Sequence, residues 1–221
     1  IARKYNLSIV EDACHAINAE REGKTAGFFS STACFSMHPL KNLNVWGDGG
    51  MIVTNDKNIY DKLSLLRNHG LRNRDICEIF GYNSRLDTLQ AIVANHYIKK
   101  IDHITDSRIL NAQFFDRELS KLSQISIPKR IKGNKQVFHI YVIRVKERDE
   151  LQRFLINNGI DAKIHYPIPM HLQPASKEFG YSKGDFPLAE KICQEALSLP
   201  VHEFISAEQR EYILSKIKEF Y

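Results

Sequence analysis

The sequence predicts an α/β protein in two parts that a long helix joins. Three short β-prone runs lie early in the chain, at positions 7–10, 33–37 and 51–55. From residue 86 to about residue 120, apolar side chains recur every three or four positions without Pro or Gly, which is typical of one long helix. A further β-prone run at 137–145 starts a second series of elements. We therefore expect domains over residues 1–120 and 121–221.

The first part carries a candidate site carboxylate at the end of its first β-prone run. Glu11 and Asp12 follow residues 7–10 directly, and His15 lies three positions after Asp12. In an open α/β sheet, polar groups at the carboxyl end of a strand face the ligand crevice. Asp12 is therefore a candidate site residue, and the cap of a turn is its alternative role.

Lys41 lies between the next two predicted strands, in a connection that contains Gly47, Gly49 and Gly50. Glycine permits backbone torsions closed to other residues and lets another group approach closely. Two roles are open for this lysine. It is either a solvated loop residue, as most lysines are, or an amine at a desolvated strand end that can lose a proton and attack an aldehyde. The lysine alone does not decide between them.

Helices and loops complete the prediction. Residues 56–69 have helical spacing and end before Gly70, a plausible C-cap, and the long helix beyond residue 86 can bridge two domains. The second part has the order β-α-β-α-α, which indicates a small α/β domain. Its expected elements are a strand at 137–145, a helix at 148–158, a strand at 162–166 halted by Pro167, a helix from 185 to about 197 that has Pro187 in its first turn, and a final helix that Ser206 and Gln209 cap.

The composition is that of an ordinary globular protein. Of the 221 residues, 43% are hydrophobic and 26% are charged, and the formal net charge of +5 includes no long basic run. This pattern argues against nucleic-acid binding and suits an anionic small molecule. The four cysteines have no metal-ligand spacing, so we expect reduced thiols in the cytoplasm and no metal. No apolar run approaches about 18 residues, the length of a membrane span. Because Ile1 is not a start methionine, we expect a fragment of a longer protein.

The candidate residues together suit a pyridoxal cofactor. Such a cofactor requires a lysine for a Schiff base, a carboxylate that keeps the pyridine nitrogen protonated, and donors for its phosphate. Asp12 supplies a carboxylate and Lys41 an amine. Ser36 and the backbone of residues 47–50 are possible phosphate or carboxylate donors.

Six blocks of residues carry a resemblance to a known family. They lie at 10–16, 35–42, 47–55, 81–90, 165–171 and 197–202. Their order and spacing are similar to those of the DegT/StrS-type sugar aminotransferases, whose C-terminal part the chain resembles. The resemblance implies the fold-type I architecture. Residues 1–120 would be the remainder of the α/β/α large domain that binds pyridoxal 5'-phosphate, with the linking helix, and 121–221 the small C-terminal α/β domain.

The resemblance also implies roles for single residues. Lys41 would form the internal aldimine, and Asp12 would pair with the pyridine nitrogen. His15 would lie beside the cofactor ring, and Ser36 would bind the phosphate. Asn83 would reach the phosphate bound to a neighbouring subunit, which makes a homodimer part of the site.

Three further residues are candidates for substrate contact. Arg85 follows Asn83 in the same block, and a structural ion pair is its alternative role. His165 and His171 lie in the segment of the small domain that faces substrate in relatives. The implied reaction transfers an amino group, usually from glutamate, to a keto-sugar that is commonly linked to a nucleotide. A keto-inositol or free keto-sugar is an alternative acceptor, and a non-catalytic regulator or truncated fragment with a structural role is the alternative function.

The family resemblance also implies two cofactor-binding features that we expect to lie before Ile1. Relatives hold the cofactor phosphate at a glycine-threonine helix N-terminus and stack an aromatic side chain on its ring, and both features precede the position of Ile1. Backbone donors at a helix N-terminus hold phosphate well. We therefore expect these 221 residues alone to bind the cofactor weakly. Lys41 argues against the branch of the family that dehydrates sugars, which has histidine at this position.

Overall fold

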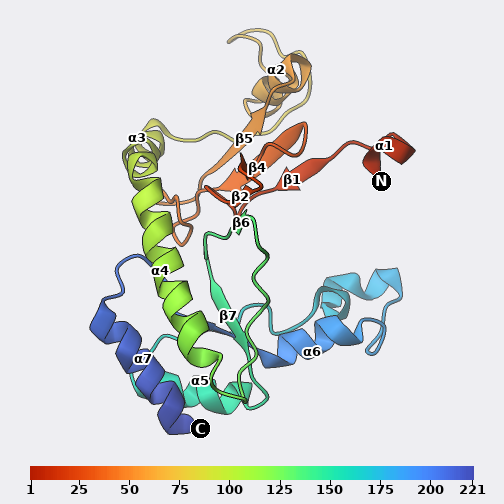
Figure 1. Cartoon of the computed structure of the whole chain (residues 1–221). Coiled ribbons are helices and arrows are strands. Elements are labelled where there is room, and N and C mark those ends of the chain that lie inside the picture. Colours follow the sequence, from red (N-terminus) through yellow and green to blue (C-terminus); the bar gives the residue numbers. More distant parts are fainter. The chain divides into compact units, whose positions relative to one another are not determined.

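The computed structural model describes all residues 1–221, and it forms two compact units (Figure 1). The first unit comprises residues 1–105 and 132–137, and the second comprises residues 106–131 and 138–221. Helices and strands are mixed in both, which confirms the α/β class. The division between the two units falls after residue 105, and the domain boundary expected at residue 120 stays a prediction. None of the helices has both the length and the apolar character that a membrane span needs.

A three-stranded sheet with the order β1-β4-β5 organises the first unit. Strand β1 (Val10–Asp12) runs parallel to β4 (Thr32–Ser36), and β5 (Gly50–Thr54) runs antiparallel to β4. Two predicted strands are thus confirmed within one residue. The first begins later than expected, because only residues 10–12 pair with β4.

The smaller elements of the first unit surround this sheet. The helix α1 (Ala2–Tyr5) precedes β1. Strands β2 (Glu20–Arg21) and β3 (Lys24–Thr25) form a hairpin, and β6 (Asn134–Lys135) pairs with β2. The two residues between β2 and β3, Glu22 and Gly23, both have positive φ, as a two-residue hairpin turn requires.

The helices of the first unit differ in detail from the prediction. The helix α2 (Lys57–Leu66) begins after Asp56, whose carboxylate accepts hydrogen bonds from two backbone N–H groups. It ends three residues earlier than expected, and Gly70 has a positive φ beyond its end. The predicted single long helix consists of α3 (Thr88–Tyr97), a 3₁₀ turn η1 (Ile98–Lys100) and α4 (Ile101–Leu119). Apolar spacing of three residues suits both helix types, so periodicity alone misses the 3₁₀ turn.

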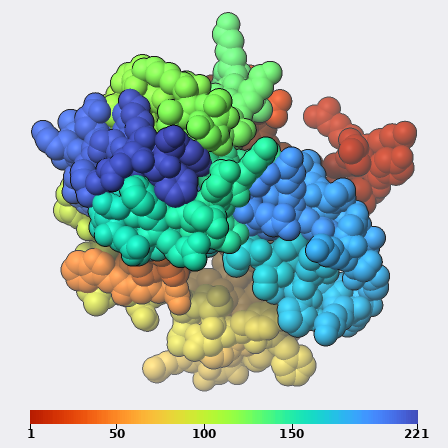
Figure 2. Space-filling model, turned by 90° about the horizontal axis from the view of Figure 1, so that it is seen from below, coloured from red at the N-terminus to blue at the C-terminus, as the bar shows by residue number.

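The second unit is built around the antiparallel pair of β7 (Tyr141–Arg144) and β8 (Ala196–Leu199). Its helices are α5 (Arg148–Asn157), α6 (Pro187–Glu195) and α7 (Ala207–Phe220), with the 3₁₀ turns η2 (Met170–Leu172) and η3 (Pro174–Phe179). The helices α5 and α7 pack together, and Figure 2 shows them side by side in teal and dark blue. The capping box at Ser206 and Gln209 is confirmed.

One prediction for the second unit is wrong. The expected strand at 162–166 makes only one bridge, from Lys163 to Ser198, and Tyr166 has a positive φ outside the extended region. The helix expected from residue 185 to about residue 197 is confirmed as α6, but it ends at Glu195, and β8 follows at once. Pairing with β7 buries Leu197 and Leu199, and this tertiary contact outweighs the local helical pattern. The strand expected at 137–145 is present only over Tyr141–Arg144.

Candidate functional site

The register of the sheet in the first unit gathers polar side chains on one face. Asp12 at the end of β1 is opposite Cys34 of β4, and Ser36 lies two positions after Cys34. Side chains two apart on a strand point to the same face, as do those of directly paired residues. Asp12, Cys34 and Ser36 therefore share one face, and Asp12 and Ser36 close the carboxyl ends of two parallel strands.

Asp12 is held as a carboxylate by its neighbours. Its Oδ1 accepts a hydrogen bond of 3.1 Å from the backbone N–H of Cys14. Hydrogen bonds from the thiol and the backbone N–H of Cys14 lower the pKa of Asp12 below its ordinary value, and the charges of His15 and Lys41 lower it further. Lys41 also lowers the pKa of the Cys14 thiol, although the hydrogen bond to Asp12 and burial give that pKa a net rise. His15 and Lys41 are thus each within electrostatic reach of Asp12.

A closed loop between β4 and β5 positions Lys41. The backbone N–H of Met37 donates to the carbonyl of Gly49 at 2.8 Å, and that of Val45 donates to the carbonyl of Met37 at 3.0 Å. Inside this loop the Lys41 N–H donates to the carbonyl of His38 at 2.8 Å, and the Asn44 amide donates to the Lys41 carbonyl at 3.1 Å. The backbone of Lys41 is therefore fixed on both sides while its amine is left to react.

Packing holds the same loop on α3. Met37, Leu43 and Val45 are buried together with Val93 of α3 in one apolar cluster. The neighbouring Asn42 is also buried, and its amide donates to the carbonyl of Val137 at 2.9 Å. Lys41 is half-buried and directly precedes the buried Asn42, so its side chain starts from an anchored part of the loop.

Ser36 has the geometry of an anion ligand. Its hydroxyl accepts a hydrogen bond of 3.3 Å from the backbone N–H of His38, and its strand partner is Gly50 of β5. A hydroxyl that accepts one hydrogen bond can still donate its own hydrogen. The hydroxyl hydrogen of Ser36 is therefore left for another acceptor, and its phosphate role stays a prediction.

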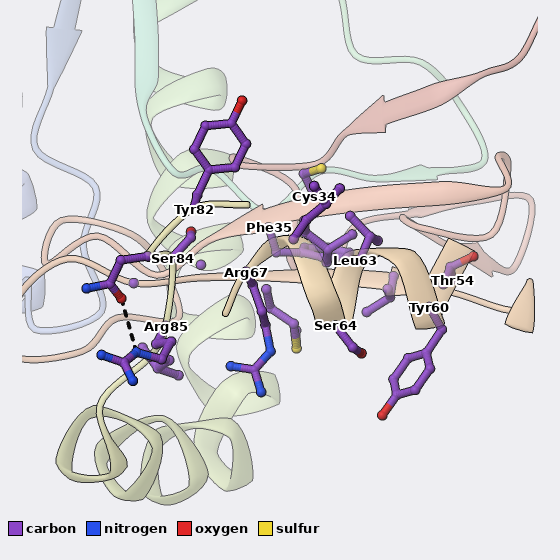
Figure 3. Close-up of a pocket in the computed structure, with 18 of the residues that line it drawn as sticks. Cys34, Phe35, Thr54, Tyr60, Leu63, Ser64, Arg67, Tyr82, Ser84 and Arg85 are labelled. Carbon is purple, nitrogen blue, oxygen red and sulfur yellow. Dashed lines mark hydrogen bonds between the residues drawn. The ribbon is translucent and has the colours of Figure 1, made fainter. Parts of the chain in front are cut away.

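Asn83 and Arg85 line a groove over the sheet, to which Cys34 of β4 also contributes (Figure 3). The groove has a volume of about 1280 Å³, and β4, β5, α2 and residues 82–87 supply its walls. The Arg85 Nε donates to the Asn83 Oδ1 at 3.0 Å, the bond drawn dashed in Figure 3. Both side chains are exposed, and neither Asp12 nor Lys41 lines this groove.

The two histidines expected to contact substrate lie in the second unit. His165 Nδ1 is 2.8 Å from the Ser198 hydroxyl, and burial, with a smaller effect of Lys163, lowers the His165 pKa. His171 Nε2 is 3.0 Å from Glu190 Oε1, and the two side chains are 7% and 11% exposed. A substrate contact through His171 Nε2 would have to replace Glu190. The substrate roles of both histidines stay predictions.

Sequence reasoning missed two residues that support the site. Cys14 donates to Asp12, but a cysteine without a partner spacing gives no signal in one sequence. Gln90 of α3 makes two hydrogen bonds with the backbone of Trp46 in the lysine loop. It lies in the block at 81–90, but nothing in that block predicts its partner 44 residues away.

Comparison with known proteins shows the family of this chain. The sequence pattern of the DegT/DnrJ/EryC1/StrS aminotransferase family matches residues 1–218. The chain belongs to this family. A "pleiotropic regulatory protein" of Geobacillus stearothermophilus is 41% identical to it over all of this chain and 60% of the relative. The "dTDP-3-amino-3,4,6-trideoxy-alpha-D-glucose transaminase" of Streptomyces venezuelae is 36% identical over all of this chain and 58% of the relative.

Solved structures of the family agree with the fold. The crystal structure of S. venezuelae DesV in complex with a ketimine intermediate has a TM-score of 0.96 and 36% identity, and covers 99% of this chain and 59% of that one. A DegT/DnrJ/EryC1/StrS aminotransferase from Brucella abortus has a TM-score of 0.93 at 31% identity, over 99% of this chain and 58% of that one. The fold-type I α/β architecture is therefore confirmed. The chain spans about 60% of the length of the curated relatives it matches.

Proposed function

We propose that the protein containing this chain is a pyridoxal 5'-phosphate-dependent aminotransferase that moves an amino group, usually from glutamate, to a keto-sugar. One observation carries the proposal: Asp12 ends strand β1, Lys41 lies in the loop that follows the neighbouring parallel strand β4, and the charge of Lys41 lowers the pKa of Asp12. An ionised carboxylate and a reactive amine are the two side chains that this cofactor requires.

The donor set fits the cofactor. Asp12, whose pKa is held below its ordinary value by Cys14, would remain ionised against the pyridine nitrogen and keep that nitrogen protonated. His15 would lie beside the ring, and the Ser36 hydroxyl would donate to the phosphate. When bound, the cofactor supplies an electron sink that lets a Cα proton leave an amino acid. Lys41 would hold the cofactor covalently through Nζ.

In the reaction, Lys41 acts as the base. Once the amino donor has displaced its Nζ, the neutral amine takes the proton from the donor's Cα and returns a proton on the other side of the transferring nitrogen. The rigid loop backbone around Lys41 keeps Nζ within reach of both positions. Asp12 changes neither charge nor place during this transfer.

The acceptor is proposed from the relatives. Relatives are named as transaminases of dTDP-linked and UDP-linked amino sugars, so a nucleotide-linked keto-sugar is the preferred acceptor. Arg85, His165 and His171 are the candidate contacts to it. A keto-inositol or a free keto-sugar is the alternative class. A screen of keto-sugars with the whole protein and glutamate tests this step, and amination of a keto-inositol alone would move the proposal to that class.

The proposed site is shared in a homodimer. Asn83 and Arg85 are exposed and hydrogen-bonded to each other, away from Asp12 and Lys41 of their own chain, which suits a role toward the cofactor phosphate of a second subunit. Mixed dimers test the shared site: a Lys41→Ala subunit paired with an Asn83→Ala subunit should keep one intact site.

All four cysteines are free thiols, which suits a reducing cytoplasm.

A regulatory role is the second candidate, because the relative with 41% identity is named a regulatory protein. The retained set of Asp12, Ser36 and Lys41 favours the enzyme, since a site without chemistry has no need of all three. Conversion of the bound cofactor by glutamate alone, followed by absorbance, distinguishes the two. Asp12→Ala should abolish this half-reaction, and a near-normal rate in that variant would remove Asp12 from its role.

A further inference from the structure

The side chain of Gln90 clamps the peptide of Trp46. The backbone N–H of Trp46 donates to Gln90 Oε1 at 2.7 Å, and Gln90 Nε2 donates to the Trp46 carbonyl at 2.8 Å. The side-chain amide thus bonds both the N–H and the C=O of one residue, as a residue of a neighbouring β-strand does. Both bonds are short for N–H···O contacts. They join the first turn of α3 to the far end of the lysine loop.

The surroundings leave little freedom for the clamped peptide. A Cβ on Gly47 would lie 3.1 Å from Gln90 Nε2, and one on Gly49 would lie 3.0 Å from a methyl group of Val45. The Trp46 indole is 70% exposed, so its ring contributes little to holding the loop. The backbone of Trp46, and not its indole, therefore holds this end of the loop against α3.

We propose that Gln90 is a positioning residue for Lys41, a role that rests on the function proposed above for that lysine. Gln90 acts through Trp46 and the closed loop of residues 37–49. The loop also contacts α3 through the apolar cluster of Met37, Leu43, Val45 and Val93. Apolar packing sets the distance of the loop from α3, whereas the directional clamp sets its position along and around the helix. A misplacement of about 1 Å in a reacting group costs about 100-fold in rate.

Three variants of the whole protein separate the clamp from mere packing. Gln90→Met keeps the length of the side chain and removes both hydrogen bonds. Gln90→Glu keeps the acceptor for the Trp46 N–H and loses the donor. Gln113→Met, on the exposed face of α4, is the matched control.

The first readout needs no cofactor. Hydrogen exchange over residues 43–50 should be about tenfold faster in Gln90→Met, given the net strength of hydrogen bonds. It should be intermediate in Gln90→Glu and unchanged in Gln113→Met.

The second readout uses the protein loaded with pyridoxal 5'-phosphate. In Gln90→Met the pH at which the absorbance of the bound cofactor changes should shift, and kcat should fall about 10- to 100-fold with KM for glutamate nearly unchanged. If borohydride fixes no cofactor on Lys41 of the unmodified protein, the proposed function fails. If it does, and both Gln90 variants match the control in exchange, pH titration and kcat, the positioning role of Gln90 is overturned. Gln90→Glu decides the question if Gln90→Met does not fold.

Discussion

The two units differ in how completely they bury their apolar residues. The second unit has one continuous core, in which Phe115, Tyr141, Leu151 and Ile217 are fully buried. The first unit has two small clusters, and Val10 and Ile52 on its sheet are 67% and 51% exposed. The candidate cofactor residues all lie in the less complete unit. Within these 221 residues, the larger apolar core and the candidate cofactor residues therefore lie in different units.

If the first unit holds the reacting groups and the second provides most of the stability, substitutions in the two units should have different effects. The largest effect is expected for Lys41→Ala in the whole protein. Loss of the general base alone costs about 10²- to 10⁴-fold, and the loss of covalent attachment adds to it. Amino transfer should fall below detection with no change in the midpoint of urea unfolding. A normal rate in this variant would mean that the site lies elsewhere.

Phe115→Ala should give the opposite result. Its ring is fully buried and packs against Phe114 and Tyr141, so its removal leaves a cavity that costs about 3–5 kcal/mol of unfolding free energy. Urea unfolding of the chain measures this loss. A change below about 1 kcal/mol would contradict the view that the second unit depends on one tightly packed core.

Glu203→Gln probes a buried ion pair of the second unit. Arg108 donates to Glu203 at 3.0 Å and to the carbonyls of Phe138 and His139, and its side chain is 8% exposed. Burial lowers the Arg108 pKa, and Glu203 partly offsets this effect. Removal of the carboxylate leaves an uncompensated buried charge, which costs about 3 kcal/mol. The double variant Arg108→Met with Glu203→Gln should recover part of the loss, and failure to recover any would argue against charge as the cause.

Acid should loosen the segment that holds His171. The N–H of Gly184 and then His171 lower the pKa of Glu190 below its ordinary value of 4.5. A lowered pKa means that the carboxylate stabilises the folded segment above about pH 4.5, and that this stability is lost as the pH falls through the lowered value. As the pH falls from about 5 to about 3, the rate of hydrogen exchange at Gly184 should therefore rise relative to the rate within α7. Glu190→Gln should remove this difference.

The smallest effect is expected for Ile52→Thr in the 221-residue chain. Ile52 lies on an exposed part of β5, and Thr keeps the β-branched shape, so unfolding free energy should change by less than about 0.5 kcal/mol. Calorimetry of the two chains measures it. A loss above about 1 kcal/mol would show that this position is covered in solution, and the contrast between the two units would be weaker.

Local signals account for the parts of the molecule that the sequence predicts well. Strands β4 and β5 and the glycine-supported loop between them agree with the prediction within one residue, because β-branched runs and glycines act over a few positions. The electrostatic coupling of Asp12 and Lys41 follows as well, since Asp12 ends β1 and Lys41 lies in the loop after the neighbouring strand β4.

Contacts between distant residues account for the parts that the sequence does not predict. Strand β8 exists because Ala196 pairs with Arg144 and Leu199 pairs with Tyr141 of β7. The local spacing of residues 185–197 favours a helix up to the start of this strand, and a pairing partner about 50 positions earlier leaves no mark on that spacing.

The supporting contacts of the site are long-range in the same way. Gln90 and Trp46 are 44 residues apart, and a single hydrogen-bonding side chain leaves no periodic trace in a sequence. The pairing of His171 with Glu190 escapes prediction because each residue alone is compatible with a solvated position. Sequence patterns therefore propose the candidate residues, and the structure is needed to find the contacts that hold them.

The most direct test of the central claim is to identify the lysine that binds the cofactor. The whole protein is saturated with pyridoxal 5'-phosphate, reduced with borohydride, digested, and sequenced by mass spectrometry, with Lys41→Ala as the control. We expect one modified peptide that carries the adduct on Lys41, and none in the control. An adduct on another lysine, or no uptake of cofactor at saturation, would contradict the assignment of Lys41.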